Sequence, residues 1–287
     1  MRAGLVATFA LVVVLVASAC GGTKHTTYPI SVYIAGQHIG AVGPGEAESF
    51  FKHTKLRVTL GYAHSIVTAP DAVERVNHAL SLRHGRINLP FKPVVSTVSV
   101  AGQHQLFPHA SEVTALSELL SVVSIDAPAV HLVKQVATSG PLVPQPVPGS
   151  DLVRWGDPEL GFVGNYKRAG RAGFGVYEAP IKHLAAKRGI HLMDLEGKTV
   201  ADVRSAVLYG HPVMAWVGGS APDPASWLTP SGKKITVDLG EHAVVLTGAR
   251  PGSFIVNDPV TGKTLKWSIA EFTKRWALIG HRALALK

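Results

Sequence analysis

The first clear pattern along this chain is the alternation of apolar and polar positions at residues 30–35, where ISVYIA places Ile30, Val32 and Ile34 on one face. Alternation with a period of two is typical of a half-buried strand. Strand-like and short helix-like pieces then alternate as far as VSTVSVAG at 95–102. The tetrapeptide AGQH occurs at 35–38 and again at 101–104, each time after a Val-rich strand, and predicts two hairpin turns. The pattern indicates a small β-rich domain over residues 30–102.

From residue 107 the apolar positions take the spacing of a helix. They are Val113, Leu116, Leu119, Leu120 and Val123, with Pro108 just upstream as a helix boundary. Further helices are expected near 178–187 and 200–209, a strand at PVMAWV, and a last helix at IAEFTKRWALI. Before that last helix, EHAVVLTGA, SFIVNDP and KTLKWS are typical of β-strands. A helix-first half followed by an antiparallel sheet predicts an α+β fold over residues 103–287.

Composition supports a folded protein and says little about partners. The hydrophobic content of 46% is enough for a full core, and the formal net charge is +9. This charge favours contact with anionic envelope polymers or lipid headgroups. The basic residues are scattered, however, and a solvated basic surface is the preferred interpretation. Nothing beyond charge points to nucleic acid, so no nucleic-acid partner is predicted.

The N-terminus carries the most specific signal for location. Arg2 precedes the apolar run LVATFALVVVLVASA, which is too short for a spanning helix and leads to Cys20, the only cysteine in the chain. The sequence ASAC resembles the end of a bacterial lipoprotein signal peptide, although Ala17 stands where a larger aliphatic residue is usual. We expect a signal peptide at 1–19, a lipid-modified Cys20, a tether at 20–29, and a mature protein anchored outside the cell membrane. The alternative is an ordinary cleavage site with a stray cysteine.

Three residues can be placed in a chemical order. Ser111 stands at the start of a predicted helix, His242 at the head of a strand and Asp258 at the end of the next strand, with a turn near 250–252 between the two strands. In a thiol hydrolase a helix N-terminus helps to hold a thiolate, a histidine pairs with it, and an Asp or Asn orients the imidazole. The alternatives are a helix-capping serine and a hydrogen-bonded His–Asp pair that only holds two strands.

Residues 103–287 resemble the bacterial double-glycine (bacteriocin leader) peptidases, cysteine peptidase family thirty-nine of the papain superfamily. The motifs that carry the resemblance are FPHASEVTAL, the segments at 156–165 and 173–181, GEHAVVLTG and VNDPVTGK. The resemblance implies a papain-like fold, a cleft for an extended peptide or protein segment, His242 as the catalytic histidine and Asp258 as its partner. It also implies an oxyanion-hole glutamine eight positions before the nucleophile, where Gln103 stands. Gln103 lies within the second AGQH, and a plain turn residue is the alternative. The small domain at 30–102 resembles ubiquitin-like modules of secreted bacterial proteins.

The chain departs from this family at the nucleophile, because Ala110 and Ser111 stand where the family has Gly-Cys. A serine hydroxyl is a far weaker acid than a thiol and needs a neutral histidine as general base. We therefore expect an inactive or weakly active peptide-binding module, a pseudoenzyme. One alternative is an active peptidase or amidase that uses Ser111, His242 and Asp258. Another is an adaptor that binds through its N-terminal domain. No cofactor or metal is implied.

Overall fold

The computed structural model describes residues 28–287. The predicted signal peptide at 1–19, the lipid site at Cys20 and most of the predicted tether lie outside these residues. No helix among the described residues is both long and apolar enough to cross a membrane.

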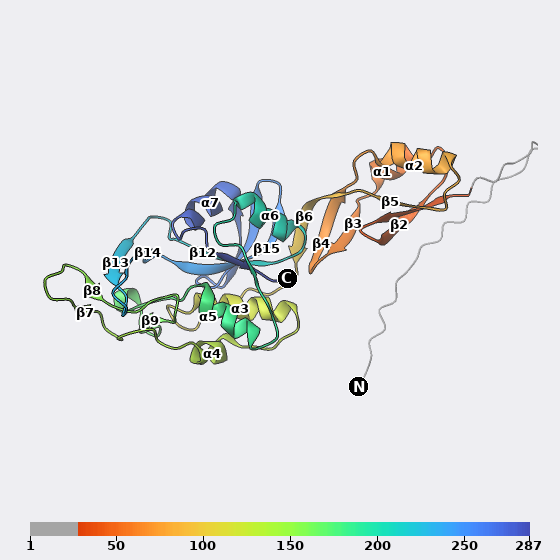
Figure 1. Cartoon of the computed structure of the whole chain (residues 1–287). Coiled ribbons are helices and arrows are strands. Elements are labelled where there is room, and N and C mark those ends of the chain that lie inside the picture. Colours follow the sequence, from red (N-terminus) through yellow and green to blue (C-terminus); the bar gives the residue numbers. More distant parts are fainter. Residues whose placement is uncertain (1–27) are drawn as a thin grey trace, which may run out of the picture.

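A small N-terminal unit is built around a three-stranded sheet with the order β2-β1-β5. Two helices cover one side of this unit (Figure 1). Its elements are β1 (Ile30–Ile34), β2 (Gln37–Val42), α1 (Ala47–His53), β3 (Arg57–Leu60), β4 (Ala63–Thr68), α2 (Ala72–Ser81), β5 (Arg86–Leu89) and β6 (Lys92–Val98). The predicted inner face is confirmed, because Ile30, Val32 and Ile34 are fully buried.

The two copies of AGQH have different structures. The first forms the predicted hairpin turn between β1 and β2, with Ala35 and Gly36 at positive φ. The second does not form a hairpin: residues 101–104 have no regular structure and lead from β6 toward the next helix. The side chain of Gln103 is hydrogen-bonded to Ser117 on that helix, and these tertiary contacts replace the predicted turn.

The larger unit begins with a buried helix and continues mainly as strands. Its first part contains α3 (Ser111–Val122), α4 (Ala129–Leu132), the short 3-10 helix η1 (Val133–Gln135), β7 (Gln145–Pro146), β8 (Val153–Arg154), β9 (Val163–Gly164), η2 (Gly170–Ala172), β10 (Gly173–Phe174) and α5 (Glu178–Ala186). Its second part contains β11 (Met193–Asp194), α6 (Val200–Leu208), β12 (Val213–Val217), β13 (Pro224–Leu228), β14 (Lys234–Asp238), β15 (His242–Arg250), β16 (Ser253–Asp258), β17 (Lys263–Ser268), α7 (Ile269–Ala277) and β18 (Ala283–Ala285). The predicted α+β layout is confirmed.

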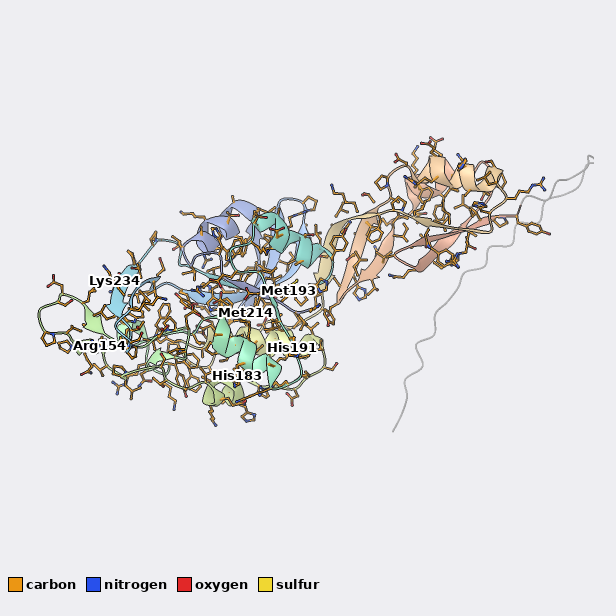
Figure 2. All side chains as sticks on the ribbon, in the orientation of Figure 1. Arg154, His183, His191, Met193, Met214 and Lys234 are labelled. Carbon is orange, nitrogen blue, oxygen red and sulfur yellow. The ribbon has the colours of Figure 1, made fainter. Side chains whose placement is uncertain are left out.

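Helices cover both faces of the central sheet of this unit. In Figure 1, α6 and α7 lie on one side of β12 and β15, and α3 and α5 lie on the other. Strand β12 is buried along its whole length, because alternate side chains enter two separate apolar clusters. Figure 2 shows the contrast between Met214, which is inside, and Arg154, His183 and Lys234, which lie on the outside.

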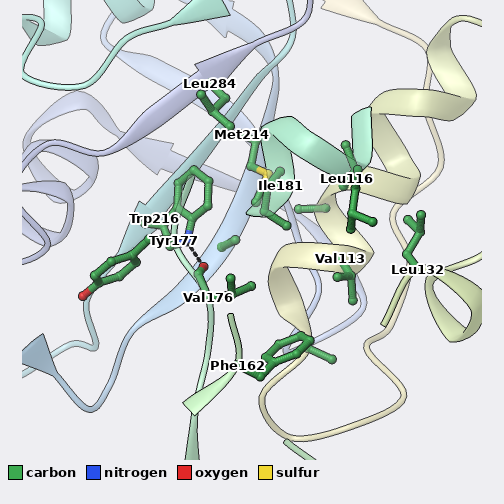
Figure 3. Packing of buried hydrophobic residues seen from close by; sticks show 14 of the residues in the cluster. Val113, Leu116, Leu132, Phe162, Val176, Tyr177, Ile181, Met214, Trp216 and Leu284 are labelled. Atoms are coloured by element: carbon green, nitrogen blue, oxygen red, sulfur yellow. Dashed lines mark hydrogen bonds between the residues drawn. The ribbon is translucent and has the colours of Figure 1, made fainter. Parts of the chain in front are cut away.

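The cluster on the α3 side fixes the position of the helix. Figure 3 shows Val113 of α3, Ile181 of α5 and Met214 and Trp216 of β12 gathered in this cluster. Trp216 also donates its indole N–H to the carbonyl oxygen of Val176 at 2.8 Å. Such packing leaves α3 little freedom to move, so its N-terminus has a defined place against the sheet.

One continuous sheet joins the two units. Its strand order is β11-β18-β12-β15-β6-β4-β3, and β16 and β17 pair beside β15. The first half of β15 pairs with β12, and residues Gly248 and Ala249 pair with β6. The division predicted between residues 102 and 103 remains a prediction, but the hydrogen-bonded ladder extends across that part of the molecule.

The turn between β3 and β4 fits against the end of α6. The N–H of Tyr62 donates to the carbonyl oxygen of Gly210 at 2.9 Å, and its phenol donates to the carbonyl oxygen of Lys287 at 2.9 Å. Gly210 has a φ of +89°, and a Cβ there would overlap the carbonyl group of Leu60. Only glycine allows the two backbones to approach this closely.

A side chain occupies one position on the far edge of the long sheet. The amide of Gln37 donates to the carbonyl oxygen of Thr59 at 2.7 Å and accepts the N–H of Thr59 at 2.8 Å. Thr59 belongs to β3, the last strand of the sheet. The Gln37 amide therefore occupies the two hydrogen-bonding positions that a further strand would use at this residue.

Candidate functional site

Ser111 is the first residue of α3 and is only 3% exposed. Its hydroxyl accepts the backbone N–H of Ala243 at 3.0 Å and donates toward Glu112 Oε2 at 3.4 Å. The cap position is Ala110, and no side chain caps the helix. The interpretation of Ser111 as a capping residue is therefore wrong: its hydroxyl joins the helix to β15.

His242 and Asp258 lie close to each other at the ends of neighbouring strands. The predicted turn is present, since β15 and β16 pair up to Arg250 and Ser253. The two atoms that face each other are His242 Nε2 and Asp258 Oδ1, 3.6 Å apart, and the side chains are 12% and 7% exposed. The structure thus places the His–Asp pair next to Ser111 along the chain of contacts. Ala243 follows His242 on β15, and its N–H binds the Ser111 hydroxyl.

The electrostatic setting favours a neutral imidazole. Burial lowers the pKa of His242, the charge of Asp258 opposes this shift, and the charge of Arg275 adds to it. Arg275 is fixed by stacking 4.1 Å over the Trp267 ring and by donating to the carbonyl oxygen of Gly218. His242 Nδ1 lies 3.5 Å from the carbonyl oxygen of Gly240, and Nε2 has no hydrogen-bond partner among the described residues. A neutral imidazole is the form that a general base requires.

Gln103 does not lie at the N-terminus of α3. Its side-chain N–H donates to Ser117 Oγ at 3.2 Å, and its backbone N–H donates to Glu118 Oε1 at 2.7 Å. Ser117 is six residues after Ser111, about 9 Å along a helix. Gln103 also lines a surface hollow of about 430 Å³ with Ser117 and Ser121. The structure places this glutamine beside the middle of the helix.

A second glutamine, Gln105, lies on the side of the site. Its backbone N–H donates to the carbonyl oxygen of Pro259, the residue after Asp258, and its side-chain N–H donates to the carbonyl oxygen of Pro108. Its Oε1 is buried with no hydrogen-bond partner among the described residues. Gln105 therefore connects the loop before α3 to the loop after β16 through these two hydrogen bonds. Sequence reasoning missed Gln105, because its contact with Pro259 joins segments that lie far apart in the chain.

Two glutamates, one buried and one partly buried, lie behind Ser111 and were not predicted. Glu112 is 1% exposed, and its Oε1 accepts the N–H of Val176 at 2.8 Å. Glu241 directly precedes His242, and its Oε1 is buried without a partner among the described residues. Their neighbour Glu178 is bound by Arg282. The sequence signal was adjacency, because each glutamate sits beside a candidate site residue.

A hollow of about 420 Å³ lies beside this acidic group. Its wall includes Tyr177, and Arg282 stacks over that ring at 3.9 Å and pairs with Glu159 at 2.7 Å. Apolar lining comes from Val237 and Leu278. The hollow has apolar and charged lining residues and offers room for a side chain of a bound molecule.

Within residues 28–287, no group of three or more His, Cys, Asp or Glu side chains is arranged to hold a metal ion. The chemistry that the site residues can perform among themselves is proton transfer and hydrogen bonding. The hydrogen bonds formed by the Ser111 hydroxyl go to Glu112 and Ala243, and neither goes to His242.

Comparison with known proteins gives one family and two solved structures. Residues 96–284 match the Peptidase_C39 like family. A putative C39-like peptidase from Bacillus anthracis is 27% identical with a TM-score of 0.57, covering 66% of this chain and 94% of that one. The peptidase domain of Streptococcus ComA, a bi-functional ABC transporter involved in a quorum sensing pathway, is 12% identical with a TM-score of 0.40 and covers 66% and 97%. No curated protein matches the chain.

Proposed function

Because the chain belongs to the Peptidase_C39 like family, we propose that it is an exported protein whose peptidase-like unit binds an extended peptide and is inactive, or nearly so, as a hydrolase. The papain-like α+β fold of this unit is confirmed by the family match and by the likeness to the Bacillus anthracis structure. In this proposal Ser111 stands where the family's peptidases carry a nucleophilic cysteine.

The observation that supports an inactive site is the engagement of the Ser111 hydroxyl. Its oxygen accepts the Ala243 N–H, and its hydrogen is directed toward Glu112. To attack a carbonyl carbon, the oxygen needs a free lone pair and a base that accepts its proton. Both requirements call for breaking hydrogen bonds that are buried, and an unmade buried hydrogen bond costs about 1–3 kcal/mol.

The geometry of His242 and Asp258 supports the second candidate, a serine hydrolase. Their separation of 3.6 Å is close to the range in which a carboxylate orients an imidazole. A rotation of the Ser111 side chain toward His242 is the step that this alternative adds. The two candidates differ in whether Ser111 reacts, and one experiment separates them.

We expect the protein lacking residues 1–19 to bind peptides without cutting them. It is incubated with a defined mixture of peptides, and the retained peptides are separated by gel filtration and identified by mass spectrometry. Ser111→Ala is the matched control, because it removes only the hydroxyl. Wild type and Ser111→Ala are expected to retain the same peptides, all intact, and a serine-directed fluorophosphonate probe is expected to label neither protein.

Two results contradict this expectation in different ways. Cleavage or probe labelling by the wild type that is lost in Ser111→Ala identifies an active serine hydrolase. Retention of no peptide by either protein removes the peptide-binding proposal altogether.

We further propose that a lipid on Cys20 holds the mature protein at the outer face of the cell membrane. The support is the sequence ASAC after an apolar run. In cells fed labelled palmitate, the wild-type protein is expected to incorporate the label and to sediment with membranes, and Cys20→Ser is expected to lose both properties. Equal labelling of the two proteins would rule out this anchor.

A further inference from the structure

Two carboxyl groups meet behind Ser111, and only the contact of Glu112 with the Ser111 hydroxyl enters the function proposed above. Glu112 follows Ser111 on α3, and Glu241 precedes His242 at the start of β15. A Cβ at Gly175 would overlap Glu112 Oε1 and would stand 3.0 Å from Glu241 Oε2. The absence of a side chain at position 175 is what lets both carboxyl groups approach the same point.

Two ionised carboxylates cannot be held this close at low cost, so such pairs retain a proton. Burial raises the pKa of Glu112 to about 7. Burial, and then the charge of Glu112, raises the pKa of Glu241 well above its ordinary value. Both pKa shifts favour retention of a proton by the pair, and the larger shift falls on Glu241.

The surroundings of the pair are mostly acidic. The other titratable groups that face it come from several elements: Tyr177 and Glu178 at the start of α5, Asp238 at the end of β14, and Arg282 before β18. The Ser111 hydroxyl of α3 adds a hydrogen bond to Glu112. Arg282 is the cation of this set, and it is already bound to Glu159 and Glu178. The charge on the pair is therefore only weakly offset.

The hydrogen bonds of Glu112 indicate which member of the pair is ionised. Its Oε1 accepts from Val176 and its Oε2 accepts from Ser111, so both oxygens act as acceptors. Glu241 Oε1, in contrast, is buried and accepts from no group among the described residues. An ionised carboxylate needs donors, and a protonated one does not need as many.

We propose that Glu241 carries the proton of the pair, and that Glu112 is ionised and is the positioning residue for position 111, holding the Ser111 hydroxyl inward and away from His242. Only proton positions are involved, and no bond between heavy atoms changes. The inference goes beyond the proposed function and does not depend on whether a peptide binds.

The experiment measures the ionisation of a thiol placed at position 111. The chain carrying Cys20→Ser and Ser111→Cys has one thiol, and its thiolate is followed by ultraviolet absorbance as the pH is raised, relative to the same chain with Ser111. No reagent has to reach the buried site. Glutamine mimics a protonated glutamate at either position, so Glu112→Gln and Glu241→Gln test the two carboxyl groups separately.

We expect Glu112→Gln to lower the midpoint of the thiol titration by about one pH unit or more, because it removes a negative charge beside the thiolate. Glu241→Gln is expected to leave the midpoint unchanged, because it replaces a group that is already neutral. Glu118→Gln is the matched control, since Glu118 is a buried carboxyl group on the same helix that contacts Gln103 and Asn257 instead. It is expected to have no effect.

Three outcomes overturn the proposal. The first is an unchanged midpoint in Glu112→Gln, and the second is a fall in Glu241→Gln as large as that in Glu112→Gln. The third is an equal fall in Glu118→Gln, which reports general loosening of the helix. If Glu112→Gln does not fold, a lowered midpoint in Glu241→Gln still contradicts the assignment. An unchanged midpoint there, with the parent midpoint above that of a free cysteine, supports it.

Discussion

Ser111→Cys is expected to acquire peptidase activity that the wild type lacks. Against a peptide retained by the wild type, we expect hydrolysis at least about 100-fold faster than that by the wild type, and full inhibition by iodoacetamide. The physical reason is that a thiolate attacks without a base, whereas the Ser111 hydroxyl must first leave Ala243 and Glu112. The assay is run from neutral to alkaline pH, because a nearby carboxylate raises the pKa of a thiol.

The control for this prediction is the double change Ser111→Cys with His242→Ala. If His242 supports the introduced thiol, the double variant loses most of the gained activity. A Ser111→Cys protein that binds the same peptides but cuts none of them would show that more than one atom separates this site from a working peptidase. Ala110 would then be the next residue to change, to glycine.

Gly210→Ala is expected to cause a large loss of stability. The new Cβ would overlap the carbonyl group of Leu60, and the φ of +89° is strained for any L-residue with a side chain. Backbone strain of this kind costs roughly 1–3 kcal/mol, and the overlap adds to it. We expect the free energy of unfolding, measured in urea, to fall by at least about 3 kcal/mol.

Gly252→Ala provides a matched control. Gly252 also has a positive φ of +72°, but a Cβ there meets nothing within 4 Å. Its substitution carries the strain alone, about 1–2 kcal/mol. Equal losses in the two variants would show that the overlap with Leu60 adds nothing to the cost of the positive φ.

Local patterns predicted the elements well where packing agrees with them. The strand at 30–34 and the helix from Ser111 were both visible, because apolar residues repeat at the period of the element that buries them. The same tetrapeptide AGQH had two outcomes, however. Its first copy forms a turn, and its second is drawn into contacts with α3. Sequence identity over four residues cannot show such contacts, because the partners lie elsewhere in the chain.

The site was predictable only in part for the same reason. His242 and Asp258 were found through motifs, and the structure places them together. The glutamate pair depends on Gly175, which lies more than sixty residues from either partner along the chain. No sequence pattern within a window of about ten or twenty residues can therefore predict that Gly175, Glu112 and Glu241 lie together. Gln105 was missed because its contacts with Pro108 and Pro259 form only in the folded chain.

The amide of Gln37 on the edge of β3 has a consequence for how copies of this protein meet. An open strand edge is a template on which a second chain can add, and such additions lead to aggregation. At Thr59 both edge positions are already taken by Gln37. Wherever copies crowd together, strand addition at Thr59 would first have to break both of these hydrogen bonds.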